Sequence, residues 1–181
     1  GFSDRMFEFF MAIRFNNNPT FFHENHDWYV EAVRDPLRDL TEALAPAIER
    51  LDPELDTRPA RVVSRLNRDI RFSNDKSPYR DYMWLSFHQP GEKRHITLGA
   101  YFDISVDGAS YGIGIYDDYR PYMNGLRRCL TMDEDALLKA WTPVKDDFQL
   151  CGNRFKRMAI PKTLQEETKK WYPLRGFYVE R

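Results

Sequence analysis

The chain has 181 residues, of which 42% are hydrophobic and 30% are charged, and its formal net charge is −1. This length suits one domain with its own hydrophobic core, and the composition argues against a disordered chain. A net charge near zero argues against attraction of the whole surface to nucleic acid or anionic lipid. No apolar run approaches the roughly 20 residues of a membrane-spanning helix. We therefore expect a single soluble domain over residues 1–181, with neither nucleic acid nor a membrane as its partner.

The cysteines and histidines are few and do not form a metal-binding pattern. Cys129 and Cys151 have no Cys or His neighbours at zinc-ligand spacing, which indicates neither a disulfide framework nor a structural zinc site. His23 and His26 lie three residues apart on an expected helix, but a metal site normally needs a third protein ligand. We expect no metal and no cofactor. The start of the sequence resembles no signal peptide, so we expect a cytoplasmic protein.

The first 24 residues predict two short helices. Closely spaced apolar residues indicate a helix over Met6–Ile13, and Ser3 or Asp4 can accept hydrogen bonds from its first N–H groups. Asn18 followed by Pro19 is typical of a cap and first turn, which predicts a second helix through Glu24.

A longer amphipathic helix follows. Its apolar residues recur at spacings of three and four from Val30 to Leu51, and Asp27 is the expected cap. Each proline removes a hydrogen bond inside a helix, so Pro36 predicts a break near residue 35 and Pro46 a second irregularity near 45. The next segment, 52–59, is expected to be a polar loop.

Strands are expected in the middle of the chain, because β-branched and aromatic residues alternate there with turn residues. The Asp107-Gly108 pair is the clearest turn signal between two of them. Four successive strands in this order favour an antiparallel meander. The expected strands are Val62–Phe72, Tyr82–Phe87, Ile96–Ile104 and Tyr111–Tyr116.

The C-terminal third predicts more helices and one or two short strands. The expected helices are Tyr119–Leu130, Asp133–Trp141 and Lys162–Trp171, and the expected strands are Phe148–Cys151 and Gly176–Glu180. Thr131 and Glu134 have the spacing of a capping box at the start of the second helix. The predicted fold class is α+β, with an antiparallel sheet of about four strands plus the short C-terminal strands, packed against N-terminal and C-terminal helices.

Charge is unevenly distributed along the chain. Residues 1–57 contain five basic and twelve acidic residues, whereas residues 58–80 contain seven basic and two acidic residues. The net charges of these two segments are −7 and +5. Positive charge is therefore concentrated in Arg58–Arg80, which is the candidate functional segment.

This segment predicts a binding site for a small anion that carries a phosphate or carboxylate group. Planar Arg forks suit such oxygens, a Lys adds a mobile point charge, and Ser and Tyr add neutral donors. The expected ligand-binding residues are Arg68, Arg71, Lys76, Ser77, Tyr79 and Arg80. Such a protein could be an enzyme, for which Asp69 is a weak catalytic candidate. Adjacent arginines stabilise the ionised form of this carboxylate, which makes it a poor proton donor near neutral pH.

A structural interpretation of the same residues stays open beside the anion site. In an extended strand Arg68 shares a face with Leu66 and Ile70, and a guanidinium among apolar residues needs a counter-charge. Arg68 and Arg71 could find it in acidic residues of the N-terminal region. The protein would then be a non-catalytic interaction domain in which the Arg and Asp residues form an ion-pair network.

The run from Asn67 to Arg80, NRDIRFSNDKSPYR, resembles the signature of the family known as domain of unknown function 2461. The Asn17-Asn18 turn before Phe21 and Phe22 supports this resemblance, as does a glycine-bearing strand followed by a helix that contains Leu126 and Arg127. The resemblance implies an α+β fold. It implies no substrate, cofactor or catalytic residue.

Overall fold

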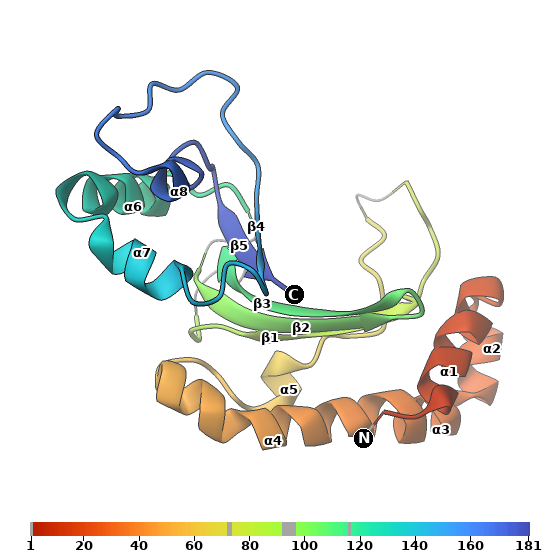
Figure 1. Cartoon of the computed structure of the whole chain (residues 1–181). Coiled ribbons are helices and arrows are strands. Elements are labelled where there is room, and N and C mark those ends of the chain that lie inside the picture. The colour runs from red at the N-terminus through yellow and green to blue at the C-terminus, as the bar shows by residue number, and fades with distance from the viewer. Residues whose placement is uncertain (1, 72–73, 92–96, 116) are drawn as a thin grey trace. The chain divides into compact units, whose positions relative to one another are not determined.

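The computed structural model describes residues 2–71, 74–91, 97–115 and 117–181. It has the predicted α+β class, with a five-stranded antiparallel sheet in the order β1-β2-β3-β5-β4 (Figure 1). The chain packs into two compact units. Unit 1 comprises Gly1–Pro90 and Tyr101–Ser110, and unit 2 comprises Gly91–Ala100 and Tyr111–Arg181.

Unit 1 builds its core between helices and strand β1. The apolar face of α1 is fully buried, and on β1 the buried residues Met83, Leu85 and Phe87 alternate with more exposed ones. Helix α4 packs on this strand (Figure 1). The elements of the first 90 residues are α1 (Asp4–Phe15), α2 (Pro19–Glu24), α3 (His26–Tyr29), the π-helix η1 (Val30–Arg34), α4 (Asp35–Leu51), α5 (Pro59–Val62) and β1 (Tyr82–Phe87).

The helix starts of unit 1 confirm one predicted cap and correct another. The Asn18 side chain accepts a hydrogen bond from the Phe21 N–H at 3.0 Å, as the Asn-Pro pair predicted. The prediction that Asp27 caps the long helix is wrong, because α3 already begins at His26 with Asn25 at its N-cap position. The break predicted near residue 35 is present as the π-helical turn η1, which ends just before Pro36. Helix α4 then runs through Pro46.

The predicted strand Val62–Phe72 is wrong. Val62 is the last residue of the short helix α5, and the described residues beyond it, 63–71, contain only isolated bridges, Val63 to Leu85 and Asn67 to Tyr79. Phe72 lies outside the described residues. Burial still alternates along this segment as it does in a strand. Ser64 and Leu66 are buried, whereas the residues before and after each of them in the sequence are not. The alternation that suggested a strand is therefore real, but the pairing is not continuous.

The other strands agree better with the sequence. Strand β1 has its predicted bounds, β2 spans Gly99–Ser105, and β3 spans Gly108–Ile115. The expected starting residue of β2, Ile96, and the expected last residue of β3, Tyr116, lie outside the described residues. Gly108 has a φ of +140°, which confirms the turn predicted at Asp107-Gly108.

Unit 2 packs three helices around two short strands. Its core contains Met123, Leu130, Trp141, Trp171 and Leu174, with Phe177 and Val179 of the last strand packed against them. Its elements after β3 are α6 (Arg120–Met132), α7 (Asp135–Trp141), β4 (Gln149–Cys151), α8 (Glu166–Lys169) and β5 (Phe177–Glu180). Both predicted C-terminal strands are confirmed.

Two predictions for unit 2 are wrong. The Thr131–Glu134 capping box does not form, because Thr131 lies inside α6 and its hydroxyl donates to the carbonyls of Arg127 and Arg128. The Glu134 carboxylate instead accepts from the Gln165 N–H at 3.0 Å. The helix expected over Lys162–Trp171 is limited to the four residues of α8.

Gly114 explains how β5 can lie beside β3. It pairs with Tyr178, and a Cβ at position 114 would stand 2.3 Å from the Phe177 carbonyl oxygen. Any larger residue would push β5 away. Gly114 is therefore a strand glycine that allows close packing.

Candidate functional site

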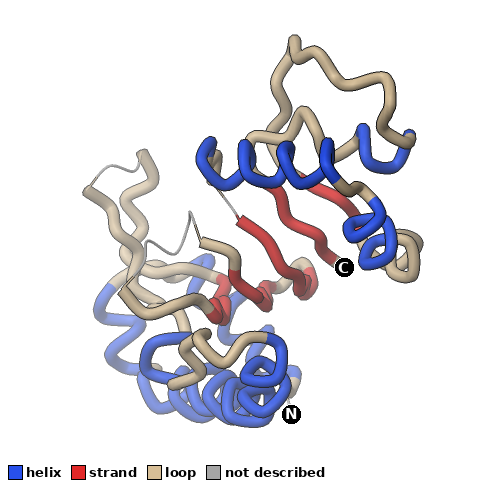
Figure 2. Tube along the Cα trace, turned by 90° about the vertical axis from the view of Figure 1, so that its left-hand side faces the viewer, coloured by secondary structure: helices blue, strands red, loops and turns tan. Residues whose placement is uncertain are grey.

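The candidate site is the basic ribbon, defined as residues 65–71 and 74–80 of unit 1. Its two arms run antiparallel, with hydrogen bonds from the Arg68 N–H to the Pro78 carbonyl and from the Arg80 N–H to the Leu66 carbonyl, both 2.8 Å. The arms carry loop rather than strand colouring in Figure 2. Backbone hydrogen bonds, rather than a regular sheet, hold the ribbon together.

The pairing register changes where the ribbon joins β1. Ser64 pairs with Trp84, since its N–H donates to the Trp84 carbonyl at 2.9 Å, yet Leu66 pairs with Arg80. Between these two pairs the first arm has one residue, Arg65, and the second arm has three, Asp81–Met83, so the second arm carries two extra residues. Bulges of this kind bend a strand and redirect side chains. Asp81 is held in place by an ion pair with Arg14, whose Nε lies 2.5 Å from Oδ2.

Tyr79 anchors the ribbon to the N-terminal helices. The Asn17 side chain donates to the Tyr79 carbonyl and accepts from the Tyr79 N–H, both at 2.9 Å. The residue is buried, and its ring lies 4.6 Å from that of Phe22. The two motifs that carry the family resemblance are thus joined physically. Tyr79, an expected ligand donor, packs as a core residue here.

Arg68 pairs with a carboxylate of the ribbon itself. Its Nη1 lies 2.5 Å from Asp75 Oδ2, while Asp75 Oδ1 accepts from the Ser77 N–H at 2.9 Å. The Ser77 N–H and hydroxyl, with the charge of Arg68, lower the pKa of Asp75. The buried Nε of Arg68 has no partner among the described residues. One side of this guanidinium is therefore neutralised and another is left without a hydrogen bond.

Arg71 pairs with Asp69 through a forked contact. Arg71 Nε lies 2.9 Å from Oδ1 and Nη2 lies 2.6 Å from Oδ2. This hydrogen bonding from Arg71 lowers the pKa of Asp69 to about 2. Asp69 is therefore ionised near neutral pH, as expected, and is a poor proton donor. Both side chains are exposed.

The prediction that Arg68 and Arg71 pair with acidic residues of the N-terminal region is wrong. Both find their partners in the ribbon, at Asp75 and Asp69. A partner two residues away along the chain needs almost no loop closure, whereas a distant carboxylate must be brought in by folding. Local pairing therefore prevails.

Three other cations of the ribbon have no ion-paired carboxylate among the described residues. Arg80 Nη1 donates to the carbonyl oxygens of Arg65, at 2.8 Å, and Asn67. Its charge contributes to the lowered pKa of Asp69 without an ion pair. Lys76 Nζ donates to the Ile70 carbonyl at 2.8 Å. The Arg65 side chain is exposed and forms no hydrogen bond or ion pair with any described residue. The ribbon therefore keeps an excess of positive charge.

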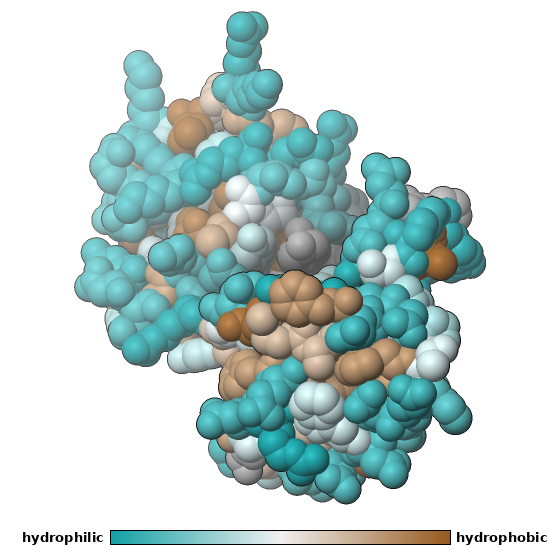
Figure 3. Space-filling view, turned by 90° about the vertical axis from the view of Figure 1, so that its right-hand side faces the viewer, coloured by the Kyte–Doolittle hydropathy of each residue, from teal (hydrophilic) through white to brown (hydrophobic). Residues whose placement is uncertain are grey.

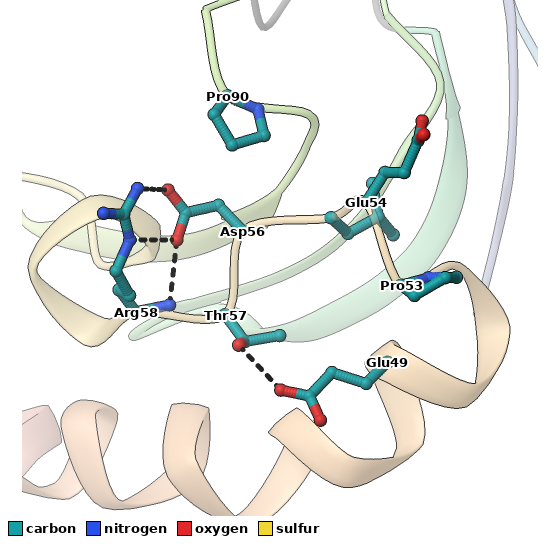
Figure 4. A pocket seen from close by; sticks show the side chains of 8 residues that line it. Glu49, Pro53, Glu54, Asp56, Thr57, Arg58 and Pro90 are labelled. Atoms are coloured by element: carbon teal, nitrogen blue, oxygen red, sulfur yellow. Dashed lines mark hydrogen bonds and ion pairs between the residues drawn. The ribbon is translucent and has the colours of Figure 1, made fainter.

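A hollow of about 400 Å³ lies outside the ribbon, at the start of the basic segment (Figure 4). It contains the Asp56–Arg58 pair, in which Oδ1 accepts from the Arg58 N–H at 3.0 Å and from Nε at 2.8 Å. The Arg58 side chain lowers the pKa of Asp56 to about 2. Glu49 and Glu54 also line this hollow. Sequence reasoning missed it because residues 52–59 resemble an exposed loop, although Leu55 and Asp56 are buried.

The two histidines considered as metal ligands, His23 and His26, do not face a metal site in the part of the chain that the structure describes. His26 packs 5.7 Å from Phe22 and 6.4 Å from Tyr29, ring centre to ring centre, and His23 is exposed. In the described ranges no three His, Cys, Asp or Glu residues come together as a metal site. None of the helices in those ranges is long and apolar enough to cross a bilayer.

Comparison with known proteins gives one match. The family model described as "Conserved hypothetical protein (DUF2461)" matches residues 5–181. No curated protein and no solved structure matches the chain. The match covers both units and includes the whole basic ribbon.

Proposed function

Because this chain belongs to the DUF2461 family, whose description names no activity, we propose from the geometry of the ribbon that the protein binds a small anion there. The ligand would carry a phosphate or carboxylate group. The observation that carries the proposal is the set of three cations, Arg65, Lys76 and Arg80, that form no ion pair with a described carboxylate. A fixed excess of positive charge on one short segment favours an anionic ligand.

Arg80 is the donor best prepared for such a ligand. Two backbone carbonyls hold its Nη1, so less side-chain freedom would be lost on binding. A carbonyl oxygen satisfies hydrogen bonds but leaves the full positive charge in place. Lys76 is in the same situation at Ile70. Both cations can therefore attract an anion without first breaking an ion pair.

The ion pairs of Arg68 and Arg71 are compatible with this proposal. Exposed ion pairs contribute little to stability, because water screens the charges and two side chains must be ordered. Asp69 and Asp75 are both about half exposed. An anion could therefore replace Asp69 at Arg71 or Asp75 at Arg68. Ser77 would act indirectly, because its N–H holds Asp75.

The alternative is an interaction domain in which these charges only stabilise the fold. The completed Arg68–Asp75 and Arg71–Asp69 pairs favour it. Under this alternative the ribbon binds no ligand. Substitution of Lys76 would then leave the affinity for every anion unchanged.

The anion site and the purely structural alternative can be distinguished by thermal unfolding. The midpoint is measured at fixed ionic strength with inorganic phosphate, pyrophosphate or citrate added. A ligand at 100 times its Kd stabilises the folded state by about 2.7 kcal/mol, a midpoint rise of about 5 to 10 °C for this size. Lys76→Ala should lower the affinity about tenfold, since a charge-assisted contact is lost. The matched control is Lys156→Ala, an exposed lysine of unit 2, which should leave the affinity unchanged. No midpoint rise with any of the three anions would refute the proposal.

A further inference from the structure

An aromatic pair on β1 adjoins the basic ribbon. Tyr82 and Trp84 are two residues apart on this strand and so share a face. Met83 and Leu85 point to the other face, where they are buried. The two rings stack with centroids 5.8 Å apart and planes 28° apart. Tyr82 is 39% exposed. The pair therefore presents the partly exposed ring of Tyr82 outside the core, backed by Trp84.

Arg80 connects this surface to the ribbon. Its guanidinium carbon lies 4.9 Å from the centre of the Trp84 ring, and its Nη1 is held by the carbonyls of Arg65 and Asn67. One side chain thus touches both the aromatic pair and the charged arm. A cation over an indole face is a favourable arrangement, and Arg stacks on rings through its planar group.

The spacing along the chain places these groups on one side. Arg80, Tyr82 and Trp84 are alternate residues, and alternate residues of an extended chain point to the same face. Arg80 can therefore lie over Trp84 while Tyr82 stacks beside the same ring. Between Arg80 and Tyr82, Asp81 is fixed by Arg14, whose Nε lies 2.5 Å from Oδ2.

Building on the proposed anion site, we propose that its ligand carries a planar ring, as a nucleoside phosphate does. The ring would stack on Tyr82 beside Trp84, and the phosphate groups would lie on Arg80, Arg65 and Lys76. Stacking of a base on an aromatic side chain contributes about 1 to 3 kcal/mol and tolerates different bases. Three cations suit the few charges of one nucleotide, whereas a nucleic acid polymer draws its affinity from many phosphate contacts.

A comparison of adenosine triphosphate with inorganic tripolyphosphate tests the ring. The two carry similar chains of phosphates, and only the first has a base. Isothermal titration at fixed ionic strength should give at least a tenfold lower Kd for adenosine triphosphate. Tyr82→Ala should raise that Kd at least fivefold and leave the Kd of tripolyphosphate unchanged. Tyr82→Phe, which keeps the ring, should bind as the wild type does.

The control variant is Tyr111→Ala, which removes a tyrosine of unit 2 that is 46% exposed. It should change neither Kd. Equal Kd values for the two probes would overturn the ring contact and leave the anion site standing. A tighter Kd for adenosine triphosphate that Tyr82→Ala does not raise would also overturn it. Binding of neither probe would remove the anion site itself.

Discussion

Two Asp-x-Arg segments of unit 1, Asp56–Arg58 and Asp69–Arg71, form the same hydrogen bonds in different surroundings. In both, Oδ1 accepts from the Arg N–H and Nε, and Oδ2 accepts from Nη2 at 2.6 Å. Both carboxyl groups have a pKa of about 2. However, the Asp56 side chain is 5% exposed and that of Asp69 is 53% exposed.

This comparison separates what a local motif does from what its burial does. The spacing of two residues is enough to set the geometry of the ion pair and the low pKa, because both partners belong to one turn of chain. Burial then decides the energetic role. A buried carboxylate that loses its partner cannot turn to water, whereas an exposed one can. We therefore expect Asp56 to support the fold and Asp69 to be replaceable.

The largest expected effect is on stability at Asp56. Asp56→Ala should lower the free energy of unfolding by about 2 kcal/mol, because a buried side chain is removed and the Arg58 N–H loses its acceptor. Urea unfolding followed by circular dichroism measures this loss. Asp69→Ala is the matched variant and should lower the midpoint much less, because solvent screens the exposed Asp69–Arg71 pair. Equal losses in the two variants would contradict the role assigned to burial.

The second expected effect is on the pH dependence of stability and is smaller than the loss in Asp56→Ala. It also comes from the buried carboxylate of Asp56. The folded pKa of Asp56 is about 2, below its ordinary value of 3.8, so the unfolded chain binds more protons between these values. The contribution of Asp56 is therefore fully present above about pH 4 and is lost as the pH falls toward 2.

Unfolding free energies of the wild type and Asp56→Asn, measured from pH 5 down to pH 2.5, check this. The difference between the two proteins should shrink as the pH falls. A difference that stays constant over this range would show that the ionised carboxylate of Asp56 is not what stabilises the fold.

The smallest expected effect is at Asp69 and concerns binding. Asp69→Asn should leave the unfolding midpoint nearly unchanged and tighten the binding of pyrophosphate severalfold, because Arg71 loses its competing charge. Titration calorimetry measures the change. Asp35→Asn is the control, since Asp35 lies on α4 and pairs with Arg34 away from the ribbon. Weaker pyrophosphate binding in Asp69→Asn would mean that Asp69 organises the site rather than blocks it.

Much of the fold followed from local patterns. The Asn18–Pro19 cap, the bounds of β1, the Asp107-Gly108 turn and the two C-terminal strands depend on residues close together in sequence. Predictions failed where distant partners compete. Thr131 has the spacing of a capping residue, but α6 continues through it. The alternating residues after Val62 resemble a strand, but the pairing register changes within Asp81–Met83 and the described pairing consists of isolated bridges.

The candidate site was predicted with the same mixture of success and failure. The concentration of positive charge and the ionised state of Asp69 could be inferred from the sequence, and the low pKa of Asp69 confirms the latter. The position of Tyr79 in the core could not, because it depends on Asn17, 62 residues away. The contact of Arg80 with Trp84 was not predicted either, because the position of the Arg80 guanidinium depends on the carbonyls of Arg65 and Asn67 in the other arm.

The sequence by itself determined the α+β class, the family and the ionised state of Asp69, because each depends on short-range spacing or on a long contiguous signature. Only the tertiary structure decided which ion pair is buried, which cations lack a carboxylate and which aromatic rings stay outside the core. Burial and charge compensation are sums over neighbours from distant parts of the chain. They therefore exist only once the chain has folded.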